Sequence, residues 1–260
     1  MSIFHVFLLS LIQGATEFLP VSSSAHLVLY NKFVVGIQSD LSLDIAMHIG
    51  SLLAVILLVA KPLKENTHSI LKKNGIKKSV SLLIFATMPL IFMGLFLEYF
   101  RIINLSRQLE VIALTNLLFA LLLFFSDRKP SRREFSDVST RDALLIGIWQ
   151  SVAVFPGTSR SGASITGARF LGFKRRDAII ISFITSIPAI TLSSAYIAFK
   201  FFNNPTKIDI GFTICAILFS FIFSYLALKF FIKLGDIFSF TPYVIYRILL
   251  GFALLTVMNI

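Results

Sequence analysis

The stretch QGATEFLPVSSSAHL, residues 13–27, interrupts an apolar chain with a dense group of polar side chains. It contains an amide, a carboxylate, three consecutive hydroxyls and an imidazole: Gln13, Glu17, Ser22, Ser23, Ser24 and His26. The apolar run IFHVFLLSLI, residues 3–12, precedes it directly. A proline inside a helical pattern ends the helix near the preceding residue. Pro20 therefore predicts a helix, a turn and a short second helix over residues 3–31.

The composition places this polar stretch in a membrane protein. The 260 residues are 56% hydrophobic, include 28 Phe and contain only 14% charged residues. A soluble domain of this length needs a wetted surface, which this composition does not supply. The net charge of +11 fits basic residues that flank membrane spans on the cytoplasmic side. No motif for binding RNA or DNA accompanies it, so we expect no nucleic-acid partner.

Six apolar runs are long enough to cross a hydrocarbon core of about 30 Å, which takes about 20 helical residues. They cover residues 43–60, 79–97, 108–126, 177–199, 211–233 and 242–259. Residues 143–171 form a further apolar segment that is broken like 3–31, by Pro, Gly and Ser, into two parts too short to span. Non-helical backbone at membrane depth survives only inside protein or against a watery cavity. Both broken segments therefore predict re-entrant helix–loop–helix hairpins.

The two broken segments also match each other. IQGATEFLPVSSSAH (12–26) and IWQSVAVFPGTSRSG (148–162) share a Gln, an aromatic residue, a Pro and a Ser-rich turn. The single membrane domain then has two halves, residues 1–126 and 143–260. Each half is predicted to contain one hairpin followed by three spans. An odd number of spans inverts the second half relative to the first, as in many membrane transporters. We therefore predict an all-α polytopic membrane protein with six transmembrane helices and two re-entrant hairpins in an inverted repeat.

Lys and Arg residues are distributed unevenly between the two predicted sides. One side carries 17 of them, in segments 61–78, 127–142, 169–177 and 229–241. The other side carries five, in segments 1–42, 98–107 and 200–210. The excess places the first set in the cytoplasm. Both termini then face outward, the hairpins enter from opposite sides, and their tips meet near the middle of the membrane.

The motif PGTSRSG, residues 156–162, places a cation at the tip of the second hairpin. An arginine at the bilayer centre costs about 2.5–3.5 kcal/mol on insertion scales, which indicates a partner. Gly157 and Gly162 would let backbone N–H groups approach a ligand, and a restarting helix would add its positive end. Hydroxyl groups come from Thr158, Ser159 and Ser161. The motif predicts a phosphate site, since guanidinium geometry suits phosphate oxygens. The alternative is that Arg160 only pairs with Glu17 and holds the hairpins together.

The polar side chains of the first hairpin have comparable alternatives. Gln13 and Glu17 are four residues apart and share one helix face. A carboxylate in the membrane indicates a metal, a base or an arginine partner, whereas Gln13 could equally bond between helices. One of the serines 22–24 is expected to cap the second helix. His26 lies one helical turn after Ser23, a spacing that allows a nucleophile-activating contact; the alternative is a structural histidine.

A third polar motif, DIAMHIGS, occupies residues 44–51 at the start of the first span. Asp44 and His48 are spaced i, i+4 on one helix face, and Gly50 allows close helix packing. We expect this pair to orient catalytic side chains by contacting them rather than the ligand. The alternative is a pair on the helix surface.

These three motifs resemble those of the undecaprenyl-diphosphate phosphatases of the bacterial envelope, also called bacitracin-resistance proteins. The resemblance covers essentially the whole chain and implies hydrolysis of undecaprenyl diphosphate to the monophosphate. That reaction recycles the lipid carrier for peptidoglycan and other envelope polymers in the bacterial cytoplasmic (inner) membrane. The resemblance also implies a divalent cation, Mg²⁺ or Ca²⁺, held near Glu17 and Gln13. Gln13 stands where many relatives have Glu, which removes one possible metal ligand. The family's essential positions match Glu17, Ser23, His26 and Arg160.

The expected mechanism has Ser23 attack the terminal phosphorus, with His26 as general base, after which water cleaves the phosphoserine. Phosphate would be bound by Ser22, Ser24, Gly157, Thr158, Ser159, Arg160 and Ser161. His26 as nucleophile and direct attack by water stay open. The charge bias favours reaction at the periplasmic face, and access from both sides stays open.

The alternative function is a transporter or flippase of a phosphorylated polyprenyl lipid. A transporter would use Arg160 and the hydroxyls, but it would not need the combination of Glu17, Ser23 and His26. The oligomeric state is not fixed by the sequence, and a homodimer is one of the open arrangements.

Overall fold

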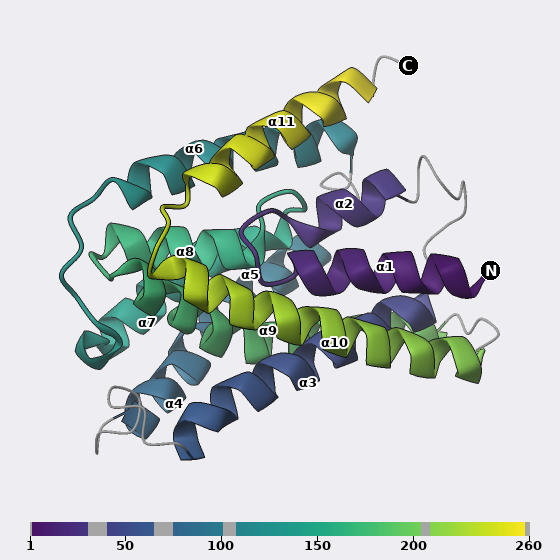
Figure 1. Ribbon diagram of the computed structural model, residues 1–260, viewed down its shortest axis with the longest axis horizontal. Helices are drawn as coiled ribbons and strands as arrows, with labels where there is room; N and C mark the ends of the chain where they lie inside the picture. The colour runs from purple at the N-terminus through teal and green to yellow at the C-terminus, as the bar shows by residue number, and fades with distance from the viewer. Residues whose placement is uncertain (1, 31–40, 65–74, 101–107, 204–208, 258–260) are drawn as a thin grey trace.

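The computed structural model describes residues 2–30, 41–64, 75–100, 108–203 and 209–257, and every regular element in them is helical (Figure 1). The α-helices are α1 (Ile3–Thr16), α2 (Ser23–Tyr30), α3 (Leu41–Lys64), α4 (Gly75–Phe85), α5 (Thr87–Tyr99), α6 (Leu109–Asp127), α7 (Thr140–Ser151), α8 (Arg160–Phe170), α9 (Arg175–Asn203), α10 (Ile210–Gly235) and α11 (Thr241–Val257). Two 3-10 turns, η3 (Phe135–Asp137) and η4 (Val152–Val154), complete the set. The predicted all-α class is confirmed.

Among the described residues, five segments have the length and composition to cross a membrane. They are Leu41–Val59, Ser79–Tyr99, Leu109–Asp127, Arg175–Asn203 and Ile210–Gly235. They coincide with five of the six predicted spans, so the chain is a multi-pass membrane protein. The remaining predicted span, 242–259, corresponds to α11, whose described part is 17 residues long and therefore shorter than the other five. The predicted side assignment cannot be followed through 31–40, 65–74, 101–107 and 204–208, which lie outside the described residues.

The predicted span 79–97 is divided into two helices rather than being continuous. α4 ends at Phe85 and α5 begins at Thr87. Pro89 lies one turn into α5, where its ring would clash with the Phe85 carbonyl in an unbroken helix. α7 crosses at this break: a Cβ atom on Gly147 would lie 2.6 Å from the carbonyl oxygen of Ala86. The break therefore lets α7 approach the backbone of the span.

Both broken segments are helix–turn–helix units, as the prolines predicted. The first consists of α1 and α2, joined by a turn at residues 17–22. The second consists of α7, the 3-10 turn η4, a turn at residues 155–159 and α8. We call the first pair of helices the N-terminal hairpin and the second pair the central hairpin.

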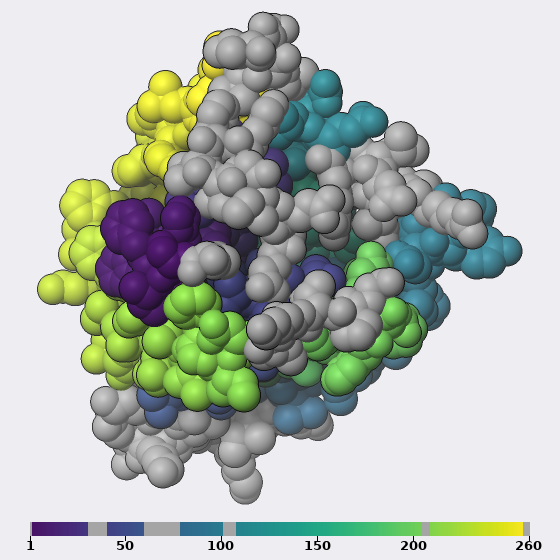
Figure 2. Space-filling model, turned by 90° about the vertical axis from the view of Figure 1, so that its right-hand side faces the viewer, coloured from purple at the N-terminus to yellow at the C-terminus, as the bar shows by residue number. Residues whose placement is uncertain are grey.

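The remaining helices flank the two hairpins. In Figure 1, α6 and α11 lie side by side along one edge of the molecule and α3 and α4 lie along the opposite edge. The first residues of α1 and the last residues of α11 lie at the same end. Figure 2 shows that end, with the first turns of α1 (purple) against those of α10 (green).

Small residues allow α10 to approach both α1 and α3 closely. A Cβ atom on Gly14 would lie 2.9 Å from the Ser220 carbonyl oxygen, and one on Gly50 would overlap the Ile217 carbonyl oxygen. Ser220 and Ser224 of α10 both hydrogen-bond to the Ser51 hydroxyl, at 3.0 Å each. Small residues and interhelical hydroxyl bonds are the usual means of packing helices in membranes. The close packing predicted for Gly50 is confirmed.

A cluster of ion pairs holds the far end of the central hairpin. The Asp127 carboxylate, at the end of α6, lies 3.3 Å from Arg169 Nε and 2.7 Å from Arg175 Nε. It also accepts the Phe240 backbone N–H at 3.0 Å. This carboxylate therefore joins the end of α8, the start of α9 and the α10–α11 connection. Arg133 and Asp142 form a second ion pair, at 2.6 Å, beside the start of α7.

Candidate active site

The candidate active site is a cavity of about 540 Å³ where the turns of both hairpins meet α5 and α9. Its polar wall at the hairpin turns includes Glu17, Ser22, Ser23, Ser24, Ser159 and Arg160, and α5 and α9 add Glu98, Ser193 and Tyr196. Its apolar wall consists mainly of Leu90, Ile91, Leu95, Ala189, Ile190 and Leu192. Ile91, Leu95 and Leu192 are also exposed on the outside of the molecule. The cavity thus combines polar groups at the hairpin turns with apolar walls that continue to the surface.

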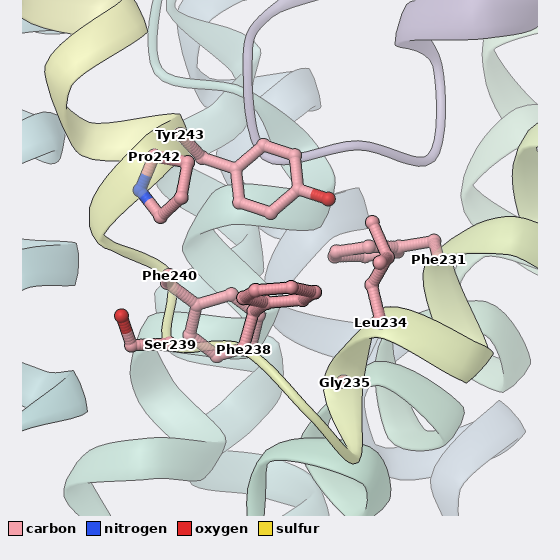
Figure 3. A pocket seen from close by; sticks show the side chains of 8 residues that line it. All are labelled: Phe231, Leu234, Gly235, Phe238, Ser239, Phe240, Pro242 and Tyr243. Atoms are coloured by element: carbon pink, nitrogen blue, oxygen red, sulfur yellow. The ribbon is translucent and has the colours of Figure 1, made fainter.

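A second, smaller pocket of about 200 Å³ lies at the α10–α11 connection (Figure 3). It is lined by Phe231, Leu234, Gly235, Phe238, Ser239, Phe240, Pro242 and Tyr243. None of these residues belongs to a predicted motif, and the pocket shares no lining residue with the larger cavity. We therefore place the candidate site in the cavity at the hairpin turns, which contains the predicted motifs.

Glu17 and Arg160 bring the two hairpins together inside that cavity. The Glu17 Oε1 atom accepts a hydrogen bond from Arg160 Nη2 at 2.7 Å, and both side chains are largely buried. The contact itself is the one that the alternative interpretation of Arg160 expected, and phosphate binding by Arg160 stays a prediction. Within the described part of the chain the ion pair uses one end of the guanidinium, because Arg160 Nη1 is buried and finds no hydrogen-bond partner there. A buried donor without a partner is uncommon. Arg160 therefore keeps an N–H group that could donate a hydrogen bond to a phosphate oxygen.

The second carboxylate oxygen of Glu17 contacts the hydroxyl that the sequence marked as a nucleophile. Ser23 Oγ donates to Glu17 Oε2 at 2.9 Å, and Gln13 Nε2 donates to the same oxygen at 3.0 Å. Ser23 is the first residue of α2 and lines the cavity. Because an ionised carboxylate can only accept hydrogen bonds, the Ser23 proton points toward Glu17. This arrangement gives Ser23 an adjacent base.

His26 does not make the contact with Ser23 that its spacing predicted. Its Nδ1 atom lies 2.7 Å from the Ser22 carbonyl oxygen, and its Nε2 atom lies 2.5 Å from the Tyr246 hydroxyl of α11. A carbonyl oxygen only accepts, so Nδ1 carries the hydrogen and Nε2 accepts from Tyr246. The two rings lie parallel, with an interplanar angle of 2°. Both ring nitrogens therefore have partners other than Ser23, and the expected role of His26 as base stays a prediction.

The same unusual turn precedes the second helix of each hairpin. Ser22 and Ser159 have φ angles of 72° and 67°, in the left-handed region that non-glycine residues rarely adopt. Each hydroxyl lies near the hydroxyl two residues later: Ser22 to Ser24 at 3.2 Å and Ser159 to Ser161 at 3.1 Å. Such backbone strain costs of order 1–3 kcal/mol and is concentrated at functional sites. The hairpins therefore share a local geometry beyond their sequence similarity.

Several residues of the PGTSRSG motif build contacts between elements rather than line the cavity. Gly157 has a φ angle of 91°, and a Cβ atom there would overlap the Ile112 carbonyl oxygen of α6. Thr158 is fully buried, and Ser161 donates to the Leu19 carbonyl oxygen at 2.8 Å. The predicted phosphate-binding set is thereby narrowed: Ser22, Ser24, Ser159 and Arg160 line the cavity, whereas Gly157, Thr158 and Ser161 do not.

Gly162 also serves a purpose other than the predicted approach to a ligand. A Cβ atom on Gly162 would lie 2.7 Å from Arg247 Nη1. Its backbone N–H donates to Ser159 Oγ at 3.1 Å, which caps the start of α8. Gly162 therefore makes room for an arginine that reaches the hairpins from α11.

The DIAMHIGS motif lies on α3 outside the cavity lining. His48 Nδ1 lies 2.7 Å from the main-chain carbonyl oxygen of Asp44. This hydrogen bond between residues i and i+4 therefore joins the His48 ring to the Asp44 backbone. His48 also lies within electrostatic range of the Glu17 carboxylate. The predicted role of Asp44 and His48 behind the site stays a prediction.

The donor atoms near Glu17 fit a divalent cation only in part. The Gln13 Oε1 atom is buried without a hydrogen-bond partner, next to the single carboxylate of Glu17. The described residues contain no group of three or more His, Cys, Asp or Glu side chains that could hold a metal ion. Mg²⁺ is commonly held by one or two carboxylates together with substrate phosphates. Glu17 and Gln13 therefore fit a cation that a phosphorylated substrate helps to hold.

These observations define a multi-pass membrane protein with a carboxylate, a hydroxyl and a guanidinium in one partly apolar cavity. Residues 6–253 match the family described as bacitracin resistance protein BacA. A protein of Aliivibrio salmonicida (strain LFI1238) named undecaprenyl-diphosphatase is 41% identical over 262 residues, covering 98% of each chain. Another of that name, from Jannaschia sp. (strain CCS1), is 40% identical over 266 residues, covering 99% of each chain. The chain belongs to the bacitracin resistance protein BacA family.

Proposed function

We propose that this protein hydrolyses undecaprenyl diphosphate to undecaprenyl phosphate and inorganic phosphate in the bacterial cytoplasmic membrane. The names of its close relatives support the substrate. The observation that carries the reaction is the position of Glu17, which bonds Ser23 with one oxygen and Arg160 with the other. One carboxylate thus links a nucleophile to a phosphate-binding cation. Recycling of the lipid carrier would support peptidoglycan synthesis and confer bacitracin resistance.

In the proposed reaction, Ser23 Oγ attacks the terminal phosphorus while Glu17 takes its proton. The bond from phosphorus to the bridging oxygen breaks, and undecaprenyl phosphate leaves with that oxygen. Water then attacks the phosphoserine, releases inorganic phosphate and restores the Ser23 hydroxyl. Phosphoryl transfer depends mainly on positioning and charge stabilisation. Arg160 lines the cavity and has an Nη1 atom without a hydrogen-bond partner among the described residues, so it would stabilise the charge on the transferred group.

In this proposal His26 positions the turn before Ser23 and does not act as the general base. Its Nδ1–H binds the carbonyl of Ser22, the strained residue directly before Ser23. Its other nitrogen is occupied by the Tyr246 hydroxyl. Tyr246 and His26 would therefore hold the turn that presents Ser23 to the substrate.

Tyr246→Phe is expected to lower kcat by roughly three- to tenfold with little change in KM, because one hydrogen bond of moderate strength is lost. Steady-state kinetics of phosphate release would measure this. Tyr243→Phe is the matched control, since Tyr243 is on the same helix but lines the other pocket. A Tyr246→Phe enzyme as active as wild type would show that His26 does not depend on this anchor.

The polyprenyl tail is assigned to the apolar wall of the cavity. Leu95 and Leu192 line the cavity and are also exposed on the outside, on α5 and α9 respectively. In a membrane, that outside is hydrocarbon, so a lipid could enter sideways with its head group directed toward Arg160. The tail would leave the apolar wall dry, which strengthens electrostatic interactions in the site.

Two residues would hold a divalent cation against the substrate phosphates. They are Glu17, through its carboxylate, and Gln13, through its amide oxygen Oε1, which has no hydrogen-bond partner among the described residues. Such a cation would neutralise part of the diphosphate charge. The protein's own residues would then position the phosphorus, remove the Ser23 proton and exclude water.

An inverted repeat in the membrane is proposed as the architecture behind this site. The shared left-handed serine before α2 and before α8 supports it. So does the paired use of glutamine: Gln13 bonds Glu17 in one hairpin, and Gln150 accepts the Ser164 hydroxyl at 3.0 Å in the other. Six spans, counting α11, and two re-entrant hairpins would follow. The bias of basic residues favours release of phosphate at the periplasmic face.

The first test is phosphate release from undecaprenyl diphosphate by purified wild-type protein in detergent, with and without a chelator. We expect release that a chelator suppresses and that added Mg²⁺ or Ca²⁺ restores. Carriage of a lipid anion would gain nothing from a carboxylate beside a serine, so the Ser23–Glu17 bond favours hydrolysis over transport. A folded protein that binds the lipid but releases no phosphate would contradict the hydrolase and favour the flippase.

A further inference from the structure

Arg247 is a fully buried cation that the proposed reaction does not use. It lies on α11, and its side chain has no measurable exposure. Among the described residues, no carboxylate lies within ion-pair distance of it, unlike Arg169 and Arg160. A buried charge without a counter-ion is expensive and marks a functional position when it lies within a membrane. Arg247 therefore needs an explanation of its own.

The partners of Arg247 are backbone carbonyl oxygens at the tips of both hairpins. Nη1 donates to the Pro20 carbonyl oxygen at 3.3 Å, in the N-terminal hairpin. Nη2 donates to the carbonyl oxygens of Gly157 and Thr158, in the central hairpin, at 2.9 Å each. A third contact of Nη2, to the Asn116 carbonyl oxygen at 3.2 Å, ties the same group to α6. One guanidinium thus connects both turns and two helices.

Other side chains are arranged around this guanidinium. Gly162 leaves the space through which Nη1 reaches Pro20, since a Cβ atom there would lie 2.7 Å from Nη1. Asn116 Nδ2 donates to the Arg247 carbonyl oxygen at 2.6 Å and fixes the backbone of α11. Nε of Arg247 is buried without a partner. The planar fork of arginine suits several carbonyl oxygens at once, which an ammonium group cannot match.

We propose that Arg247 is a positioning residue of the active site, which turns the tip carbonyls of both hairpins toward itself and adds a positive charge behind the phosphate cavity. The proposal rests on the proposed function. Glu17 and Arg160 neutralise each other, so Arg247 leaves the assembled tips with an excess positive charge. A diphosphate head group is an anion of the kind that such an excess would attract. The carbonyl oxygens of Gly157 and Thr158, in the turn directly before the cavity residues Ser159 and Arg160, are held by Arg247.

The proposal predicts different effects for geometry and for charge. Arg247→Lys keeps the positive charge but cannot bridge both turns. Arg247→Met removes the charge and the bridge together. We expect Arg247→Lys to lower kcat by about tenfold or more while the inhibition constant of inorganic pyrophosphate stays within about threefold. Arg247→Met is expected to lower kcat as well and to raise that constant by about tenfold or more. Phosphate release and its inhibition by pyrophosphate measure both quantities.

Arg169→Lys is the matched control. Arg169 is equally buried and also donates to carbonyl oxygens, those of Phe173 and Asp127, at the other end of α8. We expect its replacement to lower the unfolding temperature while kcat and pyrophosphate inhibition of the folded enzyme stay within about threefold of wild type. Equal kinetic losses in the Arg169 and Arg247 variants would show a merely structural role and overturn the proposal.

Gly162→Ala keeps the test decisive where the Arg247 variants do not fold. The added methyl would displace Nη1 without removing the charge, so kcat should fall by about threefold or more with pyrophosphate inhibition unchanged. A folded Gly162→Ala or Arg247→Lys enzyme with wild-type kcat would contradict the proposal. A wild-type protein without phosphatase activity would instead refute the proposed function. Pyrophosphate binding, measured by thermal shift of wild type and Arg247→Met, would then still test the charge.

Discussion

Ser23→Ala is expected to lower the rate of phosphate release by about 10³-fold or more, because removal of a nucleophile eliminates the covalent route. The hydroxyl lines the cavity and donates to Glu17 at 2.9 Å. The loss should appear in kcat, since lipid binding depends on the apolar wall and on Arg160. Single-turnover kinetics with undecaprenyl diphosphate would separate binding from chemistry.

Two neighbouring hydroxyls provide the controls for this experiment. Ser22 and Ser24 also line the cavity, but they bond to each other rather than to Glu17. Ser22→Ala and Ser24→Ala should therefore lose at most about tenfold, the value of a hydrogen bond. Mass spectrometry of rapidly quenched wild-type enzyme should find a phosphoryl group on the peptide that contains Ser23. A Ser23→Ala enzyme within tenfold of wild type would point to direct attack by water.

The hairpins and their ion pair could be predicted from the sequence because their physical causes are local or unavoidable. Pro20 and Pro156 cannot continue a helix, so both segments break where they were expected to. A carboxylate and a guanidinium in apolar segments need partners, and Glu17 and Arg160 supply each other at 2.7 Å. Pro89 carried the same signal, but the apolar run around it was interpreted as one straight span.

His26 shows where the sequence does not contain enough information. Its distance from Ser23 along the chain suggested a contact, but Ser22 adopts a positive φ angle that spacing cannot reveal. With α2 starting at Ser23, the His26 ring lies over the Ser22 carbonyl, whereas the Ser23 hydroxyl lies against Glu17. The partner of the other ring nitrogen, Tyr246, is 220 residues away in the chain. Only the packing of α11 brings it there.

Arg247 shows a signal that was present in the sequence but unused. It is a charged residue inside the apolar run 242–259, which by itself marks a functional position in a membrane span. Its target could not be predicted, because backbone carbonyls carry no sequence signature. The glycines of PGTSRSG were likewise recognised as close-contact positions. The space that a Cβ atom would need at Gly157 and Gly162 is filled by α6 and by Arg247.

Arg160 is the second residue whose replacement should have a very large effect, and two explanations of the Glu17–Arg160 pair make opposite predictions. Arg160→Met is expected to lower kcat/KM by about 10³-fold, because a charge-assisted phosphate contact is lost and Glu17 stays buried without its counter-ion. That loss alone would also follow if the pair only held the hairpins together.

Pyrophosphate binding to the single and double variants separates the two explanations. If Arg160 binds phosphate, Glu17→Gln should bind pyrophosphate about threefold more tightly than wild type, because a negative charge is removed and Nη2 is released. Arg160→Met and the double variant Glu17→Gln/Arg160→Met should both bind it at least about tenfold more weakly. If the pair is only structural, the neutral double variant should recover the fold and the affinity that Arg160→Met loses. Arg160 lines the cavity and its Nη1 atom has no hydrogen-bond partner among the described residues, which is the reason to expect no such recovery.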